Sequence, residues 1–269
     1  MRRAKLTDGT SIYCLLATEA TVLDYHVAGY FNHGISLSEG AVVFDVGANI
    51  GVFGVRTLQQ VKDAEVFAFE PVPAIYECLK ANAEQVDAER FHTYRAGISD
   101  HQGSLSFTYY PNSPALSTAK PEHWDDQELQ DAVDGSISHP PPHLSFTKLL
   151  PGPLRRLIAK WFAKRMRKGA QEVVAPLMTV SEVIDRHELS KIDLLKIDCE
   201  GAELECLRGV TSGHWPLIQQ VVVEVHNHND ALQEVQRILN DMGLTQQVVE
   251  QEEALQSTKL FNIFAHRPL

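Results

Sequence analysis

Two short motifs in this sequence carry residue types suited to holding an adenosine-containing cofactor. The first, Asp45-Val46-Gly47-Ala48-Asn49-Ile50-Gly51, ends one apolar run, and the second, Glu70-Pro71, ends the next. Gly47 and Gly51 permit backbone angles and a closeness of approach that a Cβ atom would prevent. Glu70 follows about one βα unit later, where a carboxylate can accept hydrogen bonds from both ribose hydroxyls. These motifs predict a cofactor-binding turn, with Ala48, Asn49 and Pro71 as further contacts.

The glycine spacing narrows the class of cofactor. A dinucleotide-binding turn has the pattern Gly-x-Gly-x-x-Gly, in which the second glycine leaves room for a pyrophosphate. This chain has Asp-x-Gly-x-x-x-Gly, and Ala48 and Asn49 fill the corresponding space. The spacing therefore disfavours a nicotinamide-dependent oxidoreductase and favours S-adenosylmethionine.

A second group of polar residues closes two later apolar runs. Lys196 and Asp198 share one face of the strand expected at 192–198, and Glu224 and His226 share one face of the strand expected at 220–226. We expect Lys196 and Glu224 to neutralise each other inside the sheet, because a buried charge is costly unless it is paired. At the open end of its strand, His226 could act as general base toward a substrate hydroxyl.

If His226 is the general base, Asp198 or Glu200 would orient His226 or the substrate. An alternative is that Asp198, Glu200, His226 and His228 bind a divalent metal, since carboxylates and imidazoles suit Mg, Mn or Zn. No tight ligand spacing requires a metal, so the preferred expectation is a site without one.

Alternating elements must position these residues. The expected strands are 41–47, 65–70, 91–96, 192–198 and 220–226, and the expected helices are 51–60, 72–84, 179–187, 201–209 and 230–242. Such alternation predicts a parallel sheet with ligands bound beyond the carboxyl ends of its strands. Residues 245–250 and 260–266 have no helix between them and predict an antiparallel terminal hairpin. This is the layout of a class I methyltransferase, an α/β Rossmann-like fold with a mostly parallel seven-stranded sheet.

We expect a single domain over 1–269 with four parts. They are an N-terminal helical segment (1–40), a cofactor-binding half (41–110), an inserted helical lid (111–178) and a substrate half (179–269). A helix is expected near 18–34, and the role of its aromatic residues Tyr25, Tyr30 and Phe31, which could cover the cofactor, stays open.

The inserted lid contains a basic amphipathic segment at 153–169. Apolar residues recur there at helical spacing among seven cations; these apolar residues are Leu154, Leu157, Ile158, Trp161, Phe162 and Met166. The preferred expectation is that this stripe packs on the sheet while the cations face water. Alternatively, the helix guides an anionic substrate, such as the arm of an acidic carrier protein, to the cofactor. Docking on a membrane surface is the least favoured alternative.

Composition limits the functional classes to which the protein can belong. The formal charge of −11, from 24 basic and 35 acidic residues, argues against a general nucleic-acid binder. The four cysteines have no paired spacing, which suggests reduced thiols. No signal-peptide pattern or long apolar run is found, so we expect a cytoplasmic protein.

Several segments together resemble the FkbM family of S-adenosylmethionine-dependent O-methyltransferases, from about residue 20 to the C-terminus. They are Asp45–Gly51, Phe69–Pro73, Gly97–Asp100, Leu194–Glu203 and Val223–His226. Phe107–Asn112 and Leu260–Ala265 look most like the members that accompany polyketide and nonribosomal peptide biosynthesis. The resemblance implies that Asp45, Gly47, Asn49 and Gly51 hold the methionine part, that Glu70 holds the ribose, and that Ser99 and Asp100 lie near the adenine. It also implies that Asp198, Glu200 and His226 meet the substrate.

The function expected from this resemblance is O-methylation of a polyketide-type or peptide-type hydroxyl, free or bound to an acyl or peptidyl carrier protein that docks on helix 153–169. A sugar or glycolipid hydroxyl is the alternative acceptor, and a non-catalytic cofactor-binding module is a distant one. The insertion is longer and more basic than in the assembly-line members, which leaves the carrier protein open.

Overall fold

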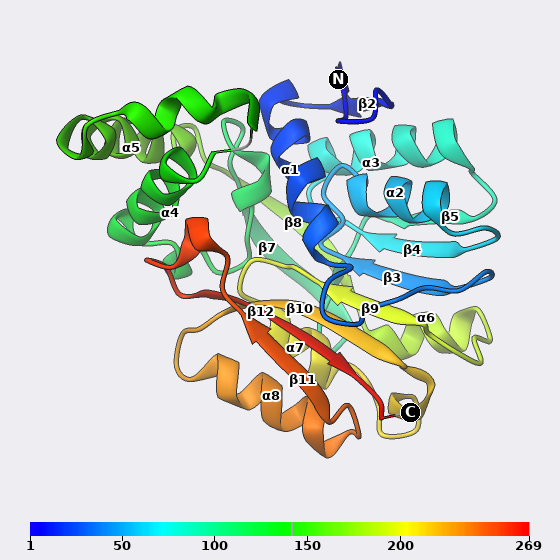
Figure 1. Ribbon diagram of the computed structural model, residues 1–269. Coiled ribbons are helices and arrows are strands. Elements are labelled where there is room, and N and C mark those ends of the chain that lie inside the picture. The colour runs from blue at the N-terminus through cyan, green and yellow to red at the C-terminus, as the bar shows by residue number, and fades with distance from the viewer. Residues whose placement is uncertain (141, 269) are drawn as a thin grey trace.

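The computed structural model describes residues 1–140 and 142–268, so Pro141 of the expected lid and Leu269 lie outside the described residues. A seven-stranded sheet forms the centre, in the order β11-β12-β10-β9-β3-β4-β5 (Figure 1). Its strands are β3 (Val42–Val46), β4 (Glu65–Phe69), β5 (Phe91–Tyr94), β9 (Leu194–Ile197), β10 (Gln220–His226), β11 (Gln246–Glu250) and β12 (Leu260–His266). β12 runs antiparallel to both of its neighbours, β10 and β11, and the other pairs in this sheet are parallel. The predicted parallel sheet with a terminal hairpin is confirmed.

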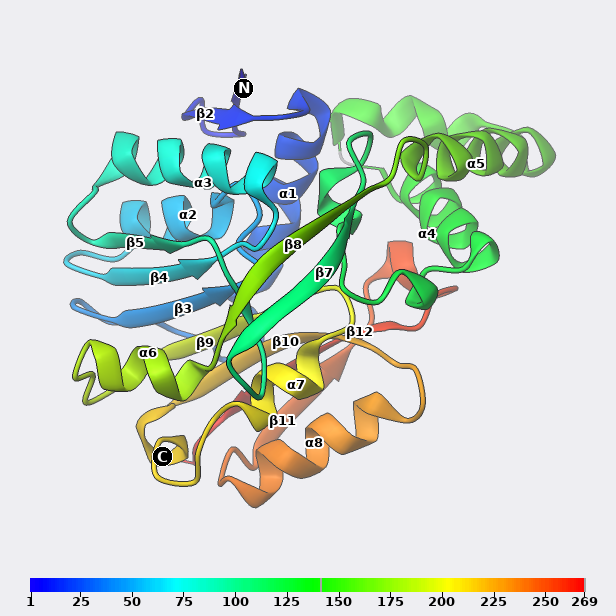
Figure 2. The same cartoon turned by 180° about the vertical axis from the view of Figure 1, so that it is seen from behind.

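Helices cover both faces of the sheet. One face carries α1 (Ala17–Gly29), α2 (Val52–Gln60) and α3 (Pro73–Val86); the other carries α6 (Val180–Arg186), α7 (Glu203–Arg208) and α8 (Ala231–Asp241) (Figure 2). The alternation along β3 explains the two layers, because Val43 joins the first apolar core while Phe44 and Val46 join the second. Because both faces of these parallel strands are buried, most of them are nearly continuous apolar runs in the sequence.

The N-terminal segment fastens α1 over the sheet. A hairpin of β1 (Arg2–Lys5) and β2 (Ser11–Cys14), which sequence reasoning did not predict, packs beside α1 and α3. The buried carboxylate of Asp24 on α1 accepts hydrogen bonds from the amide and hydroxyl of Thr7 at 2.7 and 2.6 Å. It also receives two hydrogen bonds from the Arg56 guanidinium of α2, each at 2.7 Å. Asp24 therefore joins the hairpin, α1 and α2.

One strand that was not expected precedes the predicted insertion (111–178), and another ends it. β7 (Gly103–Tyr109) pairs antiparallel with β8 (Gln171–Met178), and β8 also pairs with the short β6 (Gly97–Ile98). Between them lie the 3₁₀ helices η1 (Pro114–Leu116), η2 (Pro121–His123) and η3 (Pro142–Leu149) and the helices α4 (Asp126–Ser138) and α5 (Gly152–Met166). Two further 3₁₀ helices, η4 (Trp215–Leu217) and η5 (Glu253–Leu255), lie in later loops. The insertion is a β-ribbon that carries a helical unit (Figure 2).

The expectation that the apolar stripe of 153–169 packs on the sheet is wrong. Helix α5 packs instead against α4, and its buried residues are Ala159 and Ala163. Arg155 and Arg167 of α5 pair with Asp134 and Asp126 at 2.7 and 2.6 Å. Small side chains let the two helices approach closely, so the alanine side of α5 is the attached one. Met166 packs beside it, whereas Leu154, Leu157, Trp161 and Phe162 are exposed.

We predict that Asp24→Asn destabilises the protein far more than Asp8→Asn does. Both aspartates pair with Arg56, but the Asp24 side chain is 1% exposed and the Asp8 side chain is 46% exposed. Breaking the buried pair leaves Arg56 with the more exposed Asp8 as its acidic partner and costs about 3–5 kcal/mol, whereas a surface pair contributes about 0–1 kcal/mol. Urea unfolding of both variants measures the difference, and equal losses would contradict the role given to Asp24.

Candidate active site

A cavity of about 460 Å³ opens beyond the carboxyl ends of β3, β4 and β9. The strand ends and their loops form its floor, and Val22, His26, Val27 and Tyr30 of α1 form one wall. Residues of the insertion, including Pro114, Ser117 and Lys120, line the opposite side. This is the position at which open parallel sheets bind ligands, and the volume lies within the range of small-molecule sites.

The turn after β3 forms part of the floor because Gly47 has no side chain. Its φ is +73°, and a Cβ atom there would lie 1.7 Å from the carbonyl oxygen of Asp198. The amides of Gly47 and Ala48 both donate to the carbonyl of Phe69, at 3.1 and 2.9 Å, so β4 fixes the turn. Gly47, Ala48 and Asn49 line the cavity as expected for a cofactor-binding turn.

Gly51 and Asp45 serve this turn from outside the cavity lining. A Cβ atom on Gly51 would lie 2.7 Å from Leu79 of α3, and its φ is +85°, so glycine here permits the close packing of α2 on α3. Asp45 is fully buried in β3 and faces the ammonium group of Lys196 at 3.0 Å. Asp45 and Gly51 therefore hold the turn in place.

The predicted Lys196–Glu224 pair is wrong. Lys196 lies opposite Asp45 of β3 in the sheet register, whereas on β10 it lies opposite Val222. Its ammonium group pairs with Asp45 and, at 3.6 Å, with Asp198, and it donates to the carbonyl of Gly47 at 3.0 Å. Burial lowers the pKa of Lys196, but these carboxylates outweigh it and raise the pKa above its ordinary value.

Glu70 lies at the end of β4, where the sequence placed it. Its two carboxylate oxygens accept from the amides of Asn49 at 3.2 Å and Val72 at 2.8 Å. Burial outweighs these hydrogen bonds and raises the pKa of Glu70 to about 7. Pro71 and Ser99 also line the cavity near this end, whereas the exposed Asp100 does not belong to the lining.

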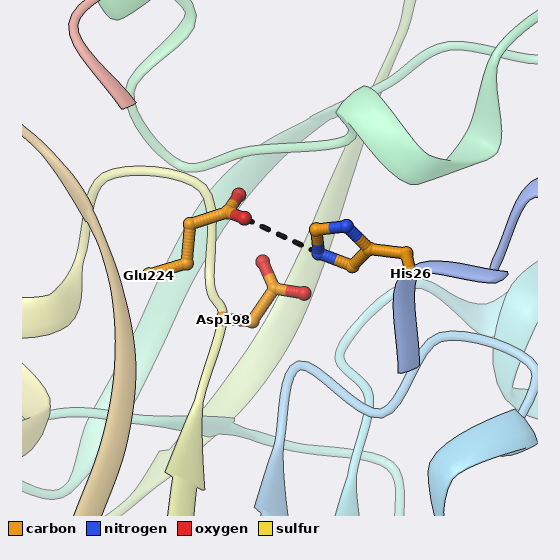
Figure 3. Close-up of side chains that lie close together, drawn as sticks. All are labelled: His26, Asp198 and Glu224. Carbon is orange, nitrogen blue, oxygen red and sulfur yellow. Dashed lines mark ion pairs between the residues drawn. The ribbon is translucent and has the colours of Figure 1, made fainter. Parts of the chain in front are cut away.

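Three ionisable side chains meet at the opposite end of the cavity. Figure 3 shows His26 of α1, Asp198 after β9 and Glu224 of β10 pointing toward one another. His26 Nε2 lies 3.2 Å from Glu224, and its Nδ1 lies 3.0 Å from Glu252. Burial lowers the pKa of His26, but hydrogen bonds and charge from Glu224 and Glu252 outweigh it, so its pKa is raised well above the ordinary value.

Tyr30 completes this cluster. Its hydroxyl donates to Asp198 at 2.9 Å and lies 2.9 Å from His26 Nε2. Among the aromatic residues whose role was open, Tyr30 lines the cavity, and Tyr25 and Phe31 do not. Sequence reasoning missed His26 and Glu252 because neither belongs to a motif and each meets the other only in the folded chain.

His226 lies apart from this cluster and does not line the large cavity. It is 2% exposed and lies between Glu200 at 3.1 Å and Glu203 at 3.2 Å. It lines a smaller cavity of about 130 Å³ together with His123 and His228. Burial lowers the pKa of His226, but the two carboxylates outweigh it, and the pKa is raised well above its usual range. The role of His226 as general base stays a prediction.

Glu200 joins the insertion to the floor of the site. It lies in the turn after β9 at φ +54°, a conformation that side chains seldom adopt. Its carboxylate accepts from the indole of Trp124 at 2.7 Å and its carbonyl accepts from the hydroxyl of Thr118 at 2.6 Å. Both partners belong to the insertion, which is thereby attached beside the acidic end of the cavity.

The donor set for a metal differs from the one considered in the sequence. Within the described residues, the group of three or more His, Cys, Asp or Glu that could hold an ion is His26, Asp198 and Glu224, whose ligand atoms lie within 4.8 Å of one another. Glu200, His226 and His228 do not belong to it. The ion pairs of His26 with Glu224 and Glu252 already satisfy both ring nitrogens.

Comparison with protein families gives one match over most of the sheet. Residues 45–245 match the methyltransferase FkbM domain. The matched range includes the glycine turn, Glu70, Asp198 and Glu224, whereas His26 and Glu252 lie outside it.

Individual relatives extend the comparison. The chain is 30% identical over 266 residues to the 31-O-demethyl-FK506 methyltransferase FkbM of Streptomyces tacrolimicus, covering 98% of this chain and 96% of the relative. It is 30% identical to the methyltransferase sdnD of Sordaria araneosa, covering 88% and 86% of the two chains. It is 24% identical to the hexuronic acid methyltransferase AglP of Haloferax volcanii, covering 79% and 66%.

We predict that Gly47→Ala costs at least about 2 kcal/mol of unfolding free energy, because overpacking and a positive φ act together. Gly29→Ala is the matched control, since nothing lies within 4 Å of its added Cβ and it ends a helix; it should change stability by less than about 1 kcal/mol. Denaturant titration of both variants gives the comparison. A neutral Gly47→Ala would show that the turn is not constrained by Asp198.

Proposed function

The chain belongs to the FkbM family of methyltransferases, and on that premise we propose that it is an S-adenosylmethionine-dependent O-methyltransferase of a natural-product hydroxyl. The observation that carries the proposal is the division of the cavity into two chemically different ends. Glu70, Pro71 and Ser99 line one end, and the acidic cluster around His26 lines the other. The family's glycine turn lies between them.

Each end suits one part of the reaction. Glu70 would accept hydrogen bonds from the ribose hydroxyls, and Ser99 would lie near the adenine. Gly47, Ala48 and Asn49 would hold the methionine part, in the same cavity that Asp198 and His26 line. The carboxylates of Asp198 and Glu224 would favour the positively charged sulfonium in this place.

The transfer itself is a displacement on carbon. When bound, S-adenosylmethionine would supply an electrophilic methyl group: the acceptor oxygen would bond to its carbon as the carbon–sulfur bond breaks, and the electron pair would stay on sulfur. The hydroxyl proton passes to the carboxylate of Glu224, which lines the same cavity and is held by His26 at 3.2 Å. Holding both reactants in line supplies much of the rate.

The names of two relatives support the acceptor class. One contains a 31-O-demethyl substrate, which gains a methyl group on oxygen, and another is a hexuronic acid methyltransferase. The higher identity and coverage of the first favour a polyketide-type or peptide-type hydroxyl for this chain. A sugar or glycolipid hydroxyl is the second candidate, supported by the other relative. The acceptor arrives either free or on a carrier protein, and the assay below separates these cases.

We predict methyl transfer from S-adenosylmethionine to a 3-hydroxyacyl acceptor, detected by mass, with matched free and carrier-loaded substrates and a hexuronic acid for comparison. His26→Ala and Glu224→Gln should lower kcat about 100-fold or more, since positioned acid–base groups contribute about 10²–10⁴-fold. The exposed His139→Ala is the control. His226→Ala tests the sequence-based choice of base in the same assay.

The outcomes separate the alternatives. A large loss of kcat in His226→Ala, with kcat unchanged in His26→Ala, would support His226 as the general base and contradict the role proposed for His26 and Glu224. Transfer only to the hexuronic acid would favour the sugar candidate, and cofactor binding without transfer to any hydroxyl would overturn the proposed reaction. Dialysis against EDTA should leave kcat unchanged, because the proposed reaction uses no metal; a loss restored by Mg²⁺ or Mn²⁺ would contradict this.

We predict that affinity for S-adenosylhomocysteine rises with pH up to about 7 and then levels off. The pKa of Glu70 is raised to about 7 without ligand. Ribose hydroxyls favour its charged form, so the pKa falls in the complex and affinity weakens up to about tenfold for each pH unit below 7. Calorimetric titration across pH measures this, and Glu70→Gln should weaken binding about tenfold at pH 8 and remove the slope. A slope that persists in Glu70→Gln would assign it to another group.

A further inference from the structure

The outer face of α5 and the adjoining η3 exposes large apolar side chains. Leu149 is 85% exposed, Phe146 67%, Leu157 65% and Trp161 59%, and Leu154 and Phe162 are also exposed. We call these six residues the outer apolar face. They fall within 17 consecutive positions, whereas other exposed large apolar residues of the described chain are scattered. A contiguous exposed apolar surface of this kind marks an interaction site.

The exposure of this face does not result from incomplete packing of α5 on the rest of the protein. Helix α5 is already attached through its opposite side, where Ala159 and Ala163 contact α4 and two arginines pair with acids of α4. In both overall views α5 lies at the outer edge of the molecule, away from the central sheet (Figure 1, Figure 2). The outer apolar face is therefore presented outward by a fixed helix.

Positive charge surrounds the face. Between residues 135 and 171 the chain has eight Lys and Arg residues and no Asp or Glu, although its formal charge is −11. Arg165 lies over the ring of Trp161, with its guanidinium carbon 5.7 Å from the ring centroid. For Arg156, Lys160 and Lys164, no ion pair with another described residue is found within 4.0 Å. The segment is a basic island on an acidic protein.

We propose that the outer apolar face docks the protein on an anionic lipid surface. Trp, Phe and Leu on one side of a helix, flanked by Lys and Arg, is the pattern of a helix that lies in the membrane interface with its apolar side chains about 5–10 Å below the headgroups. The 15 residues of α5 extend about 22 Å, which is enough to lie along such a surface. Anionic headgroups then neutralise the cations while the acyl region takes the apolar side chains.

The charge pattern selects this occupant. An acidic carrier protein would pair with the cations. It would leave without a partner most of the six large apolar side chains, which extend over both η3 and α5. A second copy of this chain has a formal charge of −11, so the cations would attract it. That attraction too would leave the apolar side chains without a partner. None of the helices in the described part of the chain could span a bilayer.

Vesicle co-sedimentation of the full chain tests the proposal without cofactor or acceptor, so it succeeds or fails independently of the proposed reaction. We expect binding to vesicles of phosphatidylcholine mixed with phosphatidylglycerol, and at least about tenfold less binding to phosphatidylcholine alone. The triple variant Leu157→Ser, Trp161→Ser, Phe162→Ser should lower binding to the mixed vesicles about tenfold or more. Lys160→Gln with Lys164→Gln should lower it at low salt and have less effect at high salt.

Val248→Ser with Val249→Ser is the matched control, since both valines are exposed on β11, away from α5; its binding should equal that of the unaltered chain. Thermal unfolding checks that all variants fold. Absence of binding to mixed vesicles by the folded chain would overturn the proposal, as would equal binding by the triple serine variant. Capture of an acidic carrier protein without vesicle binding, or a dimer that the triple variant abolishes, would assign the face to that partner instead.

Discussion

The buried ammonium group of Lys196 is the constraint on which the site depends. It faces Asp45 and Asp198 and donates to the carbonyl of Gly47, so one charge joins the end of β3, its glycine turn and the end of β9. Asp198 in turn accepts from Tyr30, which places α1 over the cavity. A buried charge is stable only when compensated. The cavity floor, its wall and the two strand ends are therefore one electrostatic unit, and His26 reaches the site because α1 is held there.

Local patterns in the sequence predicted most of the sheet. Apolar runs of strand length alternated with helical periods, and the two last runs lacked a helix, so the succession of parallel strands along the chain and the terminal hairpin followed from short-range signals. The glycine turn and Glu70 were found because a close backbone approach and a strand-end acid leave their mark within a few residues. The β1–β2 hairpin and the β7–β8 ribbon were missed because their strands are short or only partly buried, which leaves a weak alternation.

Contacts between distant residues were the part that sequence reasoning could not supply. The partner of Lys196 depends on sheet register, and a shift of two residues separates Val222 from Glu224. His26 and Glu252 meet from opposite ends of the chain, and neither has a neighbour that marks it as functional. On α5 the helical stripe was real, but periodicity identifies a face without saying whether protein covers it. In this chain alanines form the covered side.

The attachment of Thr118 and Trp124 to Glu200 bears on how this scaffold could diversify. The insertion contributes one wall of the cavity, and its two hydrogen bonds to the β9 turn go to the main chain and the side chain of Glu200. A transplanted insertion that keeps a hydroxyl and an indole at these two places could change acceptor selectivity while leaving the Gly47 turn and Glu70 intact. One that lacks them would release a residue held at positive φ. For modular engineering, a graft must therefore match these two hydrogen bonds, and also the contacts of the insertion with Glu19, Glu205 and Lys259, and not only the ends of the β7–β8 ribbon.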